Sequence, residues 1–207
     1  MVNKKILYIA AGIAIALIAT LLLSMNNEEQ QIQKTSYAEA NSLLKQKLAD
    51  HEISMSSPII LREPDDIKQY CTFFTSEETQ KNIEYCTSTE LKDKDGKFLG
   101  NVHMVGSSDE PKIVLVLIQT DPLMSQIDSV KLVFDTVIQD LVCDCWHQVK
   151  PDNFESAEQW VDGLRQFHLG DTKPHSKSKQ LTLEDKSIQL ELSTNKDGYL
   201  WQLFIYG

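Results

Sequence analysis

The sequence predicts an α+β fold, in which a mostly antiparallel sheet of two strand blocks packs against two central helices, behind an N-terminal transmembrane helix. Three observations lead to this prediction. An uncharged apolar run opens the chain, strand-like segments group before residue 121 and again after residue 180, and two segments with helical apolar spacing lie between the groups. Strands that group in blocks, without alternating with helices, are typical of α+β layers.

The apolar run covers residues 6–25, ILYIAAGIAIALIATLLLSM, and contains no charged residue. At about 1.5 Å rise per residue, the run reaches the roughly 30 Å of a bilayer core. A secretory signal usually has a shorter apolar region followed by small residues at a cleavage site. Because the run is long and ends in LLLSMNN, we predict an uncleaved anchor, with a cleaved signal and a buried core helix as the alternatives.

Charges on either side of this run predict the orientation of the chain. Lys4 and Lys5 precede the run, whereas Glu28 and Glu29 follow it. Basic residues favour the cytoplasmic side, so we expect a cytoplasmic tail at 1–5, a single pass through the cell membrane at 6–25, and an extracytoplasmic remainder. Within that remainder we expect a juxtamembrane helix and linker at 26–69 and an α+β domain at 70–207.

The formal net charge of the chain is −10, and an acidic surface repels nucleic acid and anionic lipid headgroups. We therefore expect no nucleic acid among the partners. The membrane, through residues 6–25, and a protein partner or small ligand at the cell surface are the partners that the sequence predicts.

The first elements behind the anchor follow from caps and breakers. Ser36 and Glu39 have capping-box spacing, and the apolar residues after them recur at helical intervals, which predicts a helix over about 36–50. The stretch 51–66, HEISMSSPIILREPDD, breaks this periodicity and is predicted as a linker or extended segment. Thr75 and Glu78 offer a second capping box, for a short helix between Cys71 and Cys86.

The N-terminal strand block is predicted at about 83–91, 98–105 and 112–120. Asp95-Gly96 joins the first two strands, and this dipeptide favours a tight hairpin turn because glycine accepts positive φ. The third segment, KIVLVLIQT, is nearly continuous in apolar residues and is predicted to be a central strand covered on both faces.

Two helices and the second strand block complete the predicted order. Asp121 before Pro122 is a typical helix start, and apolar residues then continue at steps of three and four as far as Cys145. Pro151 ends this helix, and Asp152 with Glu155 starts the next. Strands are predicted at 181–183, 188–194 and 199–206, with a hairpin at Asp197-Gly198.

Cysteines in an extracytoplasmic domain are expected to be bonded. The chain has four cysteines, Cys71, Cys86, Cys143 and Cys145, which allow three different pairings. While residues 143–145 remain helical, the two thiols of Cys143 and Cys145 point apart and cannot bond to each other. We therefore predict two bridges that join Cys71 and Cys86 to Cys143 and Cys145. The alternative joins Cys71 to Cys86 and leaves the other pair as thiols, or bonded in an unwound ring that serves as a redox centre.

The same cluster, Cys143, Cys145 and His147, is also a candidate copper or zinc site, because sulfur and imidazole suit these metals. The motif supplies only part of a site, since no second CxxC, HxxxH or CxxxC occurs in the chain. Further ligands could come from four residues elsewhere in the sequence, which are His103, Met104, His168 and His175.

Other patterns favour structural roles. Asp93, Asp95 and Gly96 resemble part of a calcium loop, but Met104 stands where the loop requires a glutamate, so a hairpin turn explains them better. The catalytic motifs GxSxG, HExxH, GxGxxG and GxxxxGK[ST] do not occur. We therefore expect no enzyme activity and no cofactor.

The first functional hypothesis is a disulfide-stapled, membrane-anchored extracytoplasmic domain that binds a partner or ligand. The alternative is an extracytoplasmic thiol-redox or metal-handling protein that uses Cys143, Cys145 and His147.

Overall fold

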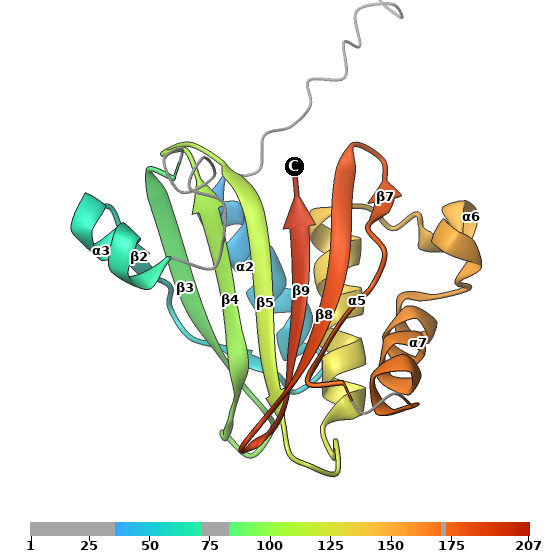
Figure 1. Ribbon diagram of the computed structural model, residues 1–207. Coiled ribbons are helices and arrows are strands. Elements are labelled where there is room, and N and C mark those ends of the chain that lie inside the picture. The colour runs from blue at the N-terminus through green and yellow to red at the C-terminus, as the bar shows by residue number, and fades with distance from the viewer. Residues whose placement is uncertain (1–35, 72–82, 171–172) are drawn as a thin grey trace, which may run out of the picture. The chain divides into compact units, whose positions relative to one another are not determined.

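A computed structural model describes residues 36–71, 83–170 and 173–207 of the chain. The strands in these residues form one antiparallel sheet (Figure 1). Its N-terminal block contains β3 (Tyr85–Lys92), β4 (Phe98–Gly106) and β5 (Pro111–Thr120), and its C-terminal block contains β8 (Lys186–Asn195) and β9 (Gly198–Tyr206). β5 pairs with β9 along its length, so the two blocks join at the centre of the sheet. The α+β class and the mostly antiparallel sheet are confirmed.

Short strands extend both edges of the sheet. β1 (Ser54–Met55) and β2 (Ile59–Leu61) pair with β3, and β6 (His175–Lys177) and β7 (Leu181–Leu183) pair with β8. β5 lies between β4 and β9, which confirms the prediction of a central strand at 112–120.

Three helices cover one face of the sheet: α2 (Tyr37–Ala49), α5 (Ile127–Leu141) and α7 (Ala157–Gly170). In Figure 1, α2 and α5 lie behind the strands. Because side chains alternate between the two faces of a strand, Val114, Val116 and Ile118 of β5 point into this layer and are buried with Trp201. The compact unit spans Thr35–Gly207, and α2 packs in the same core as the sheet.

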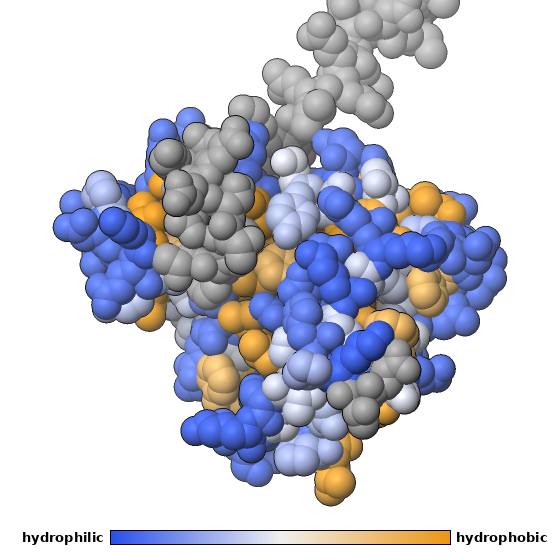
Figure 2. Space-filling model, in the orientation of Figure 1, coloured by the Kyte–Doolittle hydropathy of each residue, from blue (hydrophilic) through white to orange (hydrophobic). Residues whose placement is uncertain are grey.

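The opposite face of the sheet carries a smaller apolar cluster, which contains Leu115, Phe204 and the disulfide-bonded Cys71 and Cys86. Figure 2 views the molecule from this side, where hydrophilic and hydrophobic residues are mixed at the surface. Helix α3 (Pro64–Tyr70) contributes Ile67 to the cluster. The short helix expected around Thr75 and Glu78 lies outside the described residues.

The segment 51–66, expected as a linker or extended segment, contains the extended strands β1 and β2 and also the start of α3, which was not expected. The edge of β3 supplies hydrogen-bonding partners for its backbone, with Leu61 opposite Cys86 and Met55 opposite Leu91. Long-range pairing of this kind needs no local periodicity, so Pro58, which directly precedes β2, did not prevent it.

Both helix starts of the central segment differ from the expected ones. The carboxylate of Asp121 accepts hydrogen bonds from the backbone N–H groups of Leu123 and Ser125 at 3.0 and 2.9 Å, which closes a turn, and α5 begins later, at Ile127. α7 begins at Ala157, where the Ser156 hydroxyl accepts from the backbone N–H of Gln159 at 3.2 Å. Between the two helices lie the short helices α6 (Trp146–Val149) and η1 (Pro151–Asn153).

Both predicted hairpins are confirmed. Gly96 has φ +75° in the turn between β3 and β4, and Gly198 has φ +134° where β9 begins. No helix in the described part of the chain is long and apolar enough to cross a membrane. The predicted span at residues 6–25 lies outside that part.

Candidate functional site

Two local disulfides connect the four cysteines: Cys71 with Cys86, and Cys143 with Cys145. No free cysteine remains. The two bridges predicted between the early and the late pair are therefore wrong. The reason is the length of α5, which ends at Leu141 and not near Pro151. Residues 143–145 are therefore not helical, and the side chains of Cys143 and Cys145 can turn toward each other across a Cα separation of 5.2 Å. That separation is within the usual range for a disulfide.

The end of α5 sets the backbone path into the Cys143–Cys145 ring. The N–H groups of Val142 and Cys143 both donate to the carbonyl of Ile138, at 2.9 and 3.0 Å, which terminates the helix. Asp144 is the single residue between the bonded cysteines and is exposed.

Trp146 anchors the other side of the ring. Its side chain is buried, its indole N–H donates to the carbonyl of Phe154 at 3.0 Å, and its ring lies 5.6 Å from that of Trp160. Trp160 is also buried, so both tryptophans belong to the main core. The disulfide loop is therefore held between the end of one helix and a buried tryptophan.

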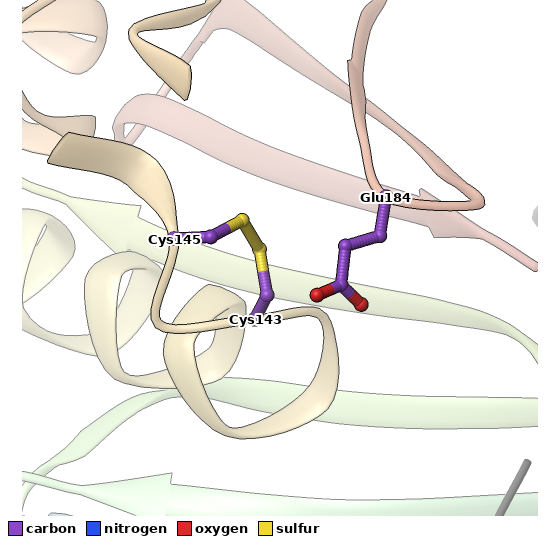
Figure 3. Close-up of side chains that lie close together, drawn as sticks. All are labelled: Cys143, Cys145 and Glu184. Carbon is purple, nitrogen blue, oxygen red and sulfur yellow. A yellow bond between two sulfur atoms is a disulfide. The ribbon is translucent and has the colours of Figure 1, made fainter. Parts of the chain in front are cut away.

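Glu184 faces the disulfide from the turn between β7 and β8 (Figure 3). Its carboxylate and the two sulfur atoms all lie within 4.8 Å of one another. Lys186, at the start of β8, donates from its Nζ to the carbonyl of Leu141. A cation at the last carbonyls of a helix is favourable, so this contact docks the turn against α5 and brings Glu184 to the sulfurs.

The disulfide is partly open, and two carboxylates, of Asp144 and Glu184, lie near it against a nearby cation, Lys186. Cys143 and Cys145 are half-buried, with one side packed on the main core, whereas Asp144 and Glu184 are exposed. Negative charge on both carboxylates favours the approach of cations over anions. By contrast, Cys71 and Cys86 are only 2% and 0% exposed, so solvent and reagents reach the two disulfides very differently.

The other metal candidates from the sequence do not join this group. Among the described residues, the group of side chains that could hold a metal contains Cys143, Cys145 and Glu184, without His147. His147 is exposed on α6, near Asp135; burial raises the pKa of Asp135, and His147 acts in the opposite direction. No local pattern around the cysteines indicated Glu184, because this residue comes from a different part of the chain.

His168 and His175 lie within hydrogen-bonding distance of serine or threonine hydroxyls. His168 is 2% exposed, and its Nδ1 and Nε2 lie 2.9 and 2.8 Å from the hydroxyls of Ser176 and Thr194. Burial, and then the neighbouring His175, lower the pKa of His168, so this ring is neutral at neutral pH and links α7 to β6 and β8. His175 in turn lies 2.8 Å from the Ser193 hydroxyl.

His103 and Met104 are consecutive on β4 and therefore point to opposite faces of the sheet. His103 is 8% exposed, and burial lowers its pKa to about 4. Met104 is buried in the main core, where Asn41 donates to its sulfur at 3.6 Å. Both residues lie in the layers of the fold, and neither belongs to the group at Cys143.

The turn at Asp93 explains the weak calcium pattern. One carboxylate oxygen of Asp93 accepts from the backbone N–H groups of Asp95 and Lys97, at 2.9 Å each. Asp93 therefore closes the β3–β4 hairpin through its side chain, as the turn interpretation predicts.

Comparisons of the chain with known protein families, curated proteins and solved structures gave no match. The function is therefore argued from the chemistry of the Cys143–Cys145 site.

Proposed function

We propose that this protein exchanges thiols and disulfides through the Cys143–Cys145 pair, in the extracytoplasmic compartment that its sequence predicts. The supporting observation is that the pair is bonded across a single residue at a half-buried position. Disulfides that solvent can reach are typical of exchange centres, whereas buried structural disulfides resist reduction.

Loop length supports the division of roles between the two disulfides. Cys71 and Cys86 are 15 residues apart, and closing a loop of this size contributes about 3 kcal/mol to stability. Cys143 and Cys145 are 2 residues apart, for which the same relation gives only about 1.5 kcal/mol. The second bridge also connects no distant segments, so a stapling role explains it poorly.

The exchange needs a dithiol on a partner. A thiolate of that dithiol attacks one sulfur of the Cys143–Cys145 bond, which breaks and leaves a mixed disulfide and one released thiolate. The second thiolate of the partner then attacks the partner's other cysteine sulfur, which is bonded to the protein in the mixed disulfide. The partner leaves as a disulfide, having given two electrons to Cys143 and Cys145, which take up two protons and become thiols.

The charges around the pair predict the kind of partner. Asp144 and Glu184 place negative charge beside the sulfurs, so they disfavour anionic thiols such as glutathione and favour cysteines flanked by basic residues. The predicted substrate class is therefore a protein or peptide dithiol in a basic segment.

The first hypothesis from the sequence, a surface binding domain, stays a prediction. A groove of about 490 Å³ at the start of α5 is lined by apolar residues that include Leu123, Met124 and Tyr199. The cation of this groove, Arg165, lies 3.1 Å from the carboxylate of Asp162. This lining does not indicate a particular ligand, whereas the disulfide indicates a reaction.

The test uses a reduced peptide with two cysteines flanked by lysines. The oxidised protein is expected to convert about one equivalent of the reduced peptide to its disulfide. With the disulfide form of the same peptide, the Cys143→Ser and Cys145→Ser single variants should form mixed disulfides that mass spectrometry detects, because the remaining thiolate attacks the peptide disulfide and releases one peptide thiol. The double variant Cys143→Ala/Cys145→Ala is expected to be inactive. Equal oxidation of the peptide by the wild type and the double variant would contradict the proposal.

A further inference from the structure

We infer that the reduced form of the Cys143–Cys145 site binds one divalent cation of the zinc class, with Glu184 as the third ligand. This inference rests on the proposed function, because the sulfurs become ligands only after the disulfide is reduced. It assigns to the site a ligand and a form of regulation: the oxidised pair excludes the cation, and reduction admits it.

The geometry is close to that of a zinc site. The two sulfurs and the Glu184 carboxylate lie within 4.8 Å of one another. Donor atoms around tetrahedral zinc are about 3.5 to 4 Å apart, given a Zn–S distance of about 2.3 Å. Once the S–S bond breaks, the sulfurs must move apart to reach this spacing, which side-chain rotation can supply. Figure 3 shows the carboxylate directed toward the cysteines from the neighbouring turn.

The donor set selects the cation. Two thiolates are soft ligands that disfavour magnesium and calcium, whereas a carboxylate oxygen suits zinc better than copper(I). Three ionised donors carry three negative charges, with the exposed Asp144 close by. A divalent cation offsets more of this charge than a monovalent one. With three protein ligands, the fourth position stays open to water or to a substrate thiolate.

Electrons and protons balance in each step. Reduction by an external dithiol or phosphine transfers two electrons to the S–S bond, and the two sulfurs take up two protons. Binding of zinc then displaces these protons, because only thiolates coordinate the metal. Reoxidation of the pair by a partner disulfide breaks both Zn–S bonds and releases the cation.

The backbone at Glu184 provides a useful variant. Glu184 has φ +52°, a left-handed conformation that glutamate rarely adopts and asparagine adopts more readily. Glu184→Asn is therefore expected to preserve the turn while removing the carboxylate, and Glu184→Gln removes the charge at nearly constant shape. Asp185→Asn is the matched control, since it removes a charge from the same turn, and Asp185 lies outside the group that could hold a metal.

The test is a titration with cobalt(II), followed by competition with zinc, on the whole protein after reduction by a phosphine that is then removed. Alkylation and mass spectrometry first count the free thiols and confirm that Cys71–Cys86 is intact. The reduced protein is expected to give a thiolate-to-cobalt charge-transfer band at one cobalt per chain, which zinc abolishes, and the oxidised protein to give none. Glu184→Gln and Glu184→Asn should weaken zinc binding at least tenfold, and Asp185→Asn by less than threefold.

The outcomes separate the two proposals. If no thiol appears at Cys143 and Cys145 after treatment with the phosphine, the proposed exchange function fails, and the zinc site fails with it. If both thiols appear but no charge-transfer band forms, only the zinc inference is overturned. Equal zinc affinity in the wild type and Glu184→Gln would overturn the assignment of Glu184 as a ligand.

Discussion

Removing each disulfide separately is expected to destabilise the protein by different amounts. Cys71→Ala/Cys86→Ala opens a loop with a separation of 15 residues and should lower the free energy of unfolding by about 3 kcal/mol from loop entropy alone. The loss of two buried side chains adds to this cost, because both cysteines pack against Leu115 and Phe204 in one cluster. Cys143→Ala/Cys145→Ala opens a separation of 2 residues and should cost about 1.5 kcal/mol or less.

The assay is urea unfolding without reductant, followed by circular dichroism. At a slope of about 2 kcal/mol/M, the first double variant should lower the urea midpoint by about 1.5 M or more and the second by less than about 0.8 M. Wild-type protein with both disulfides intact, verified by mass, is the reference. A larger loss for Cys143→Ala/Cys145→Ala than for Cys71→Ala/Cys86→Ala would show that the Cys143–Cys145 bridge is the main staple and would refute the division of roles.

Three further predictions concern the fold. Burial lowers the pKa of His103 from 6.5 to about 4, so the unfolded state takes up a proton at higher pH than the folded state does. The free energy of unfolding should therefore fall by about 3 kcal/mol as the pH drops from 6.5 to 4. His103→Asn should flatten this part of the measured pH profile, and an unchanged profile would contradict the role of His103. Gly198→Ala places a Cβ 2.2 Å from the carbonyl oxygen of Thr120 at φ +134°, so it should lower stability by about 3 kcal/mol in thermal melts. Gly96→Ala, at φ +75° with open space around the Cβ, should cost about 1 kcal/mol. Equal effects of the two variants would be inconsistent with a clash at Thr120. Ser36→Ala removes the hydroxyl that accepts from the Glu39 backbone N–H at 3.3 Å and should cost about 1 kcal/mol by the same measurement, and no loss would argue against the cap.

Much of the fold was predictable, because short-range chemistry determined it. Asp95-Gly96 and Asp197-Gly198 predicted two hairpins, and the apolar run at 112–120 predicted the central strand. Helix α3 was predictable but missed: Pro64 at its first turn, followed by Asp65 and Asp66, is a recognised start signal. The breaks in periodicity around that signal favoured a linker interpretation.

The site was less predictable, because long-range contacts decide it. Cys145 continues the apolar spacing of α5, so the pattern predicted a longer helix, but Trp146 is buried against the region of Phe154 and Trp160, and the chain leaves the helix to reach it. The backbone of Glu184 is left-handed, but the position is not occupied by glycine or asparagine, the residues that usually mark this conformation in a sequence. Its position beside the sulfurs depends on the docking of the turn by Lys186, which no local pattern indicates.

The two disulfides have different roles in this proposal: Cys143–Cys145 exchanges, whereas Cys71–Cys86 remains structural. The most direct measurement equilibrates the native protein with a series of glutathione redox buffers and quantifies each disulfide by differential alkylation and mass spectrometry. We expect Cys143 and Cys145 to pass from oxidised to reduced across the series while Cys71 and Cys86 remain bonded, and we expect Glu184→Gln to speed the approach to equilibrium. Opening of both disulfides together, or of Cys71–Cys86 first, would contradict it.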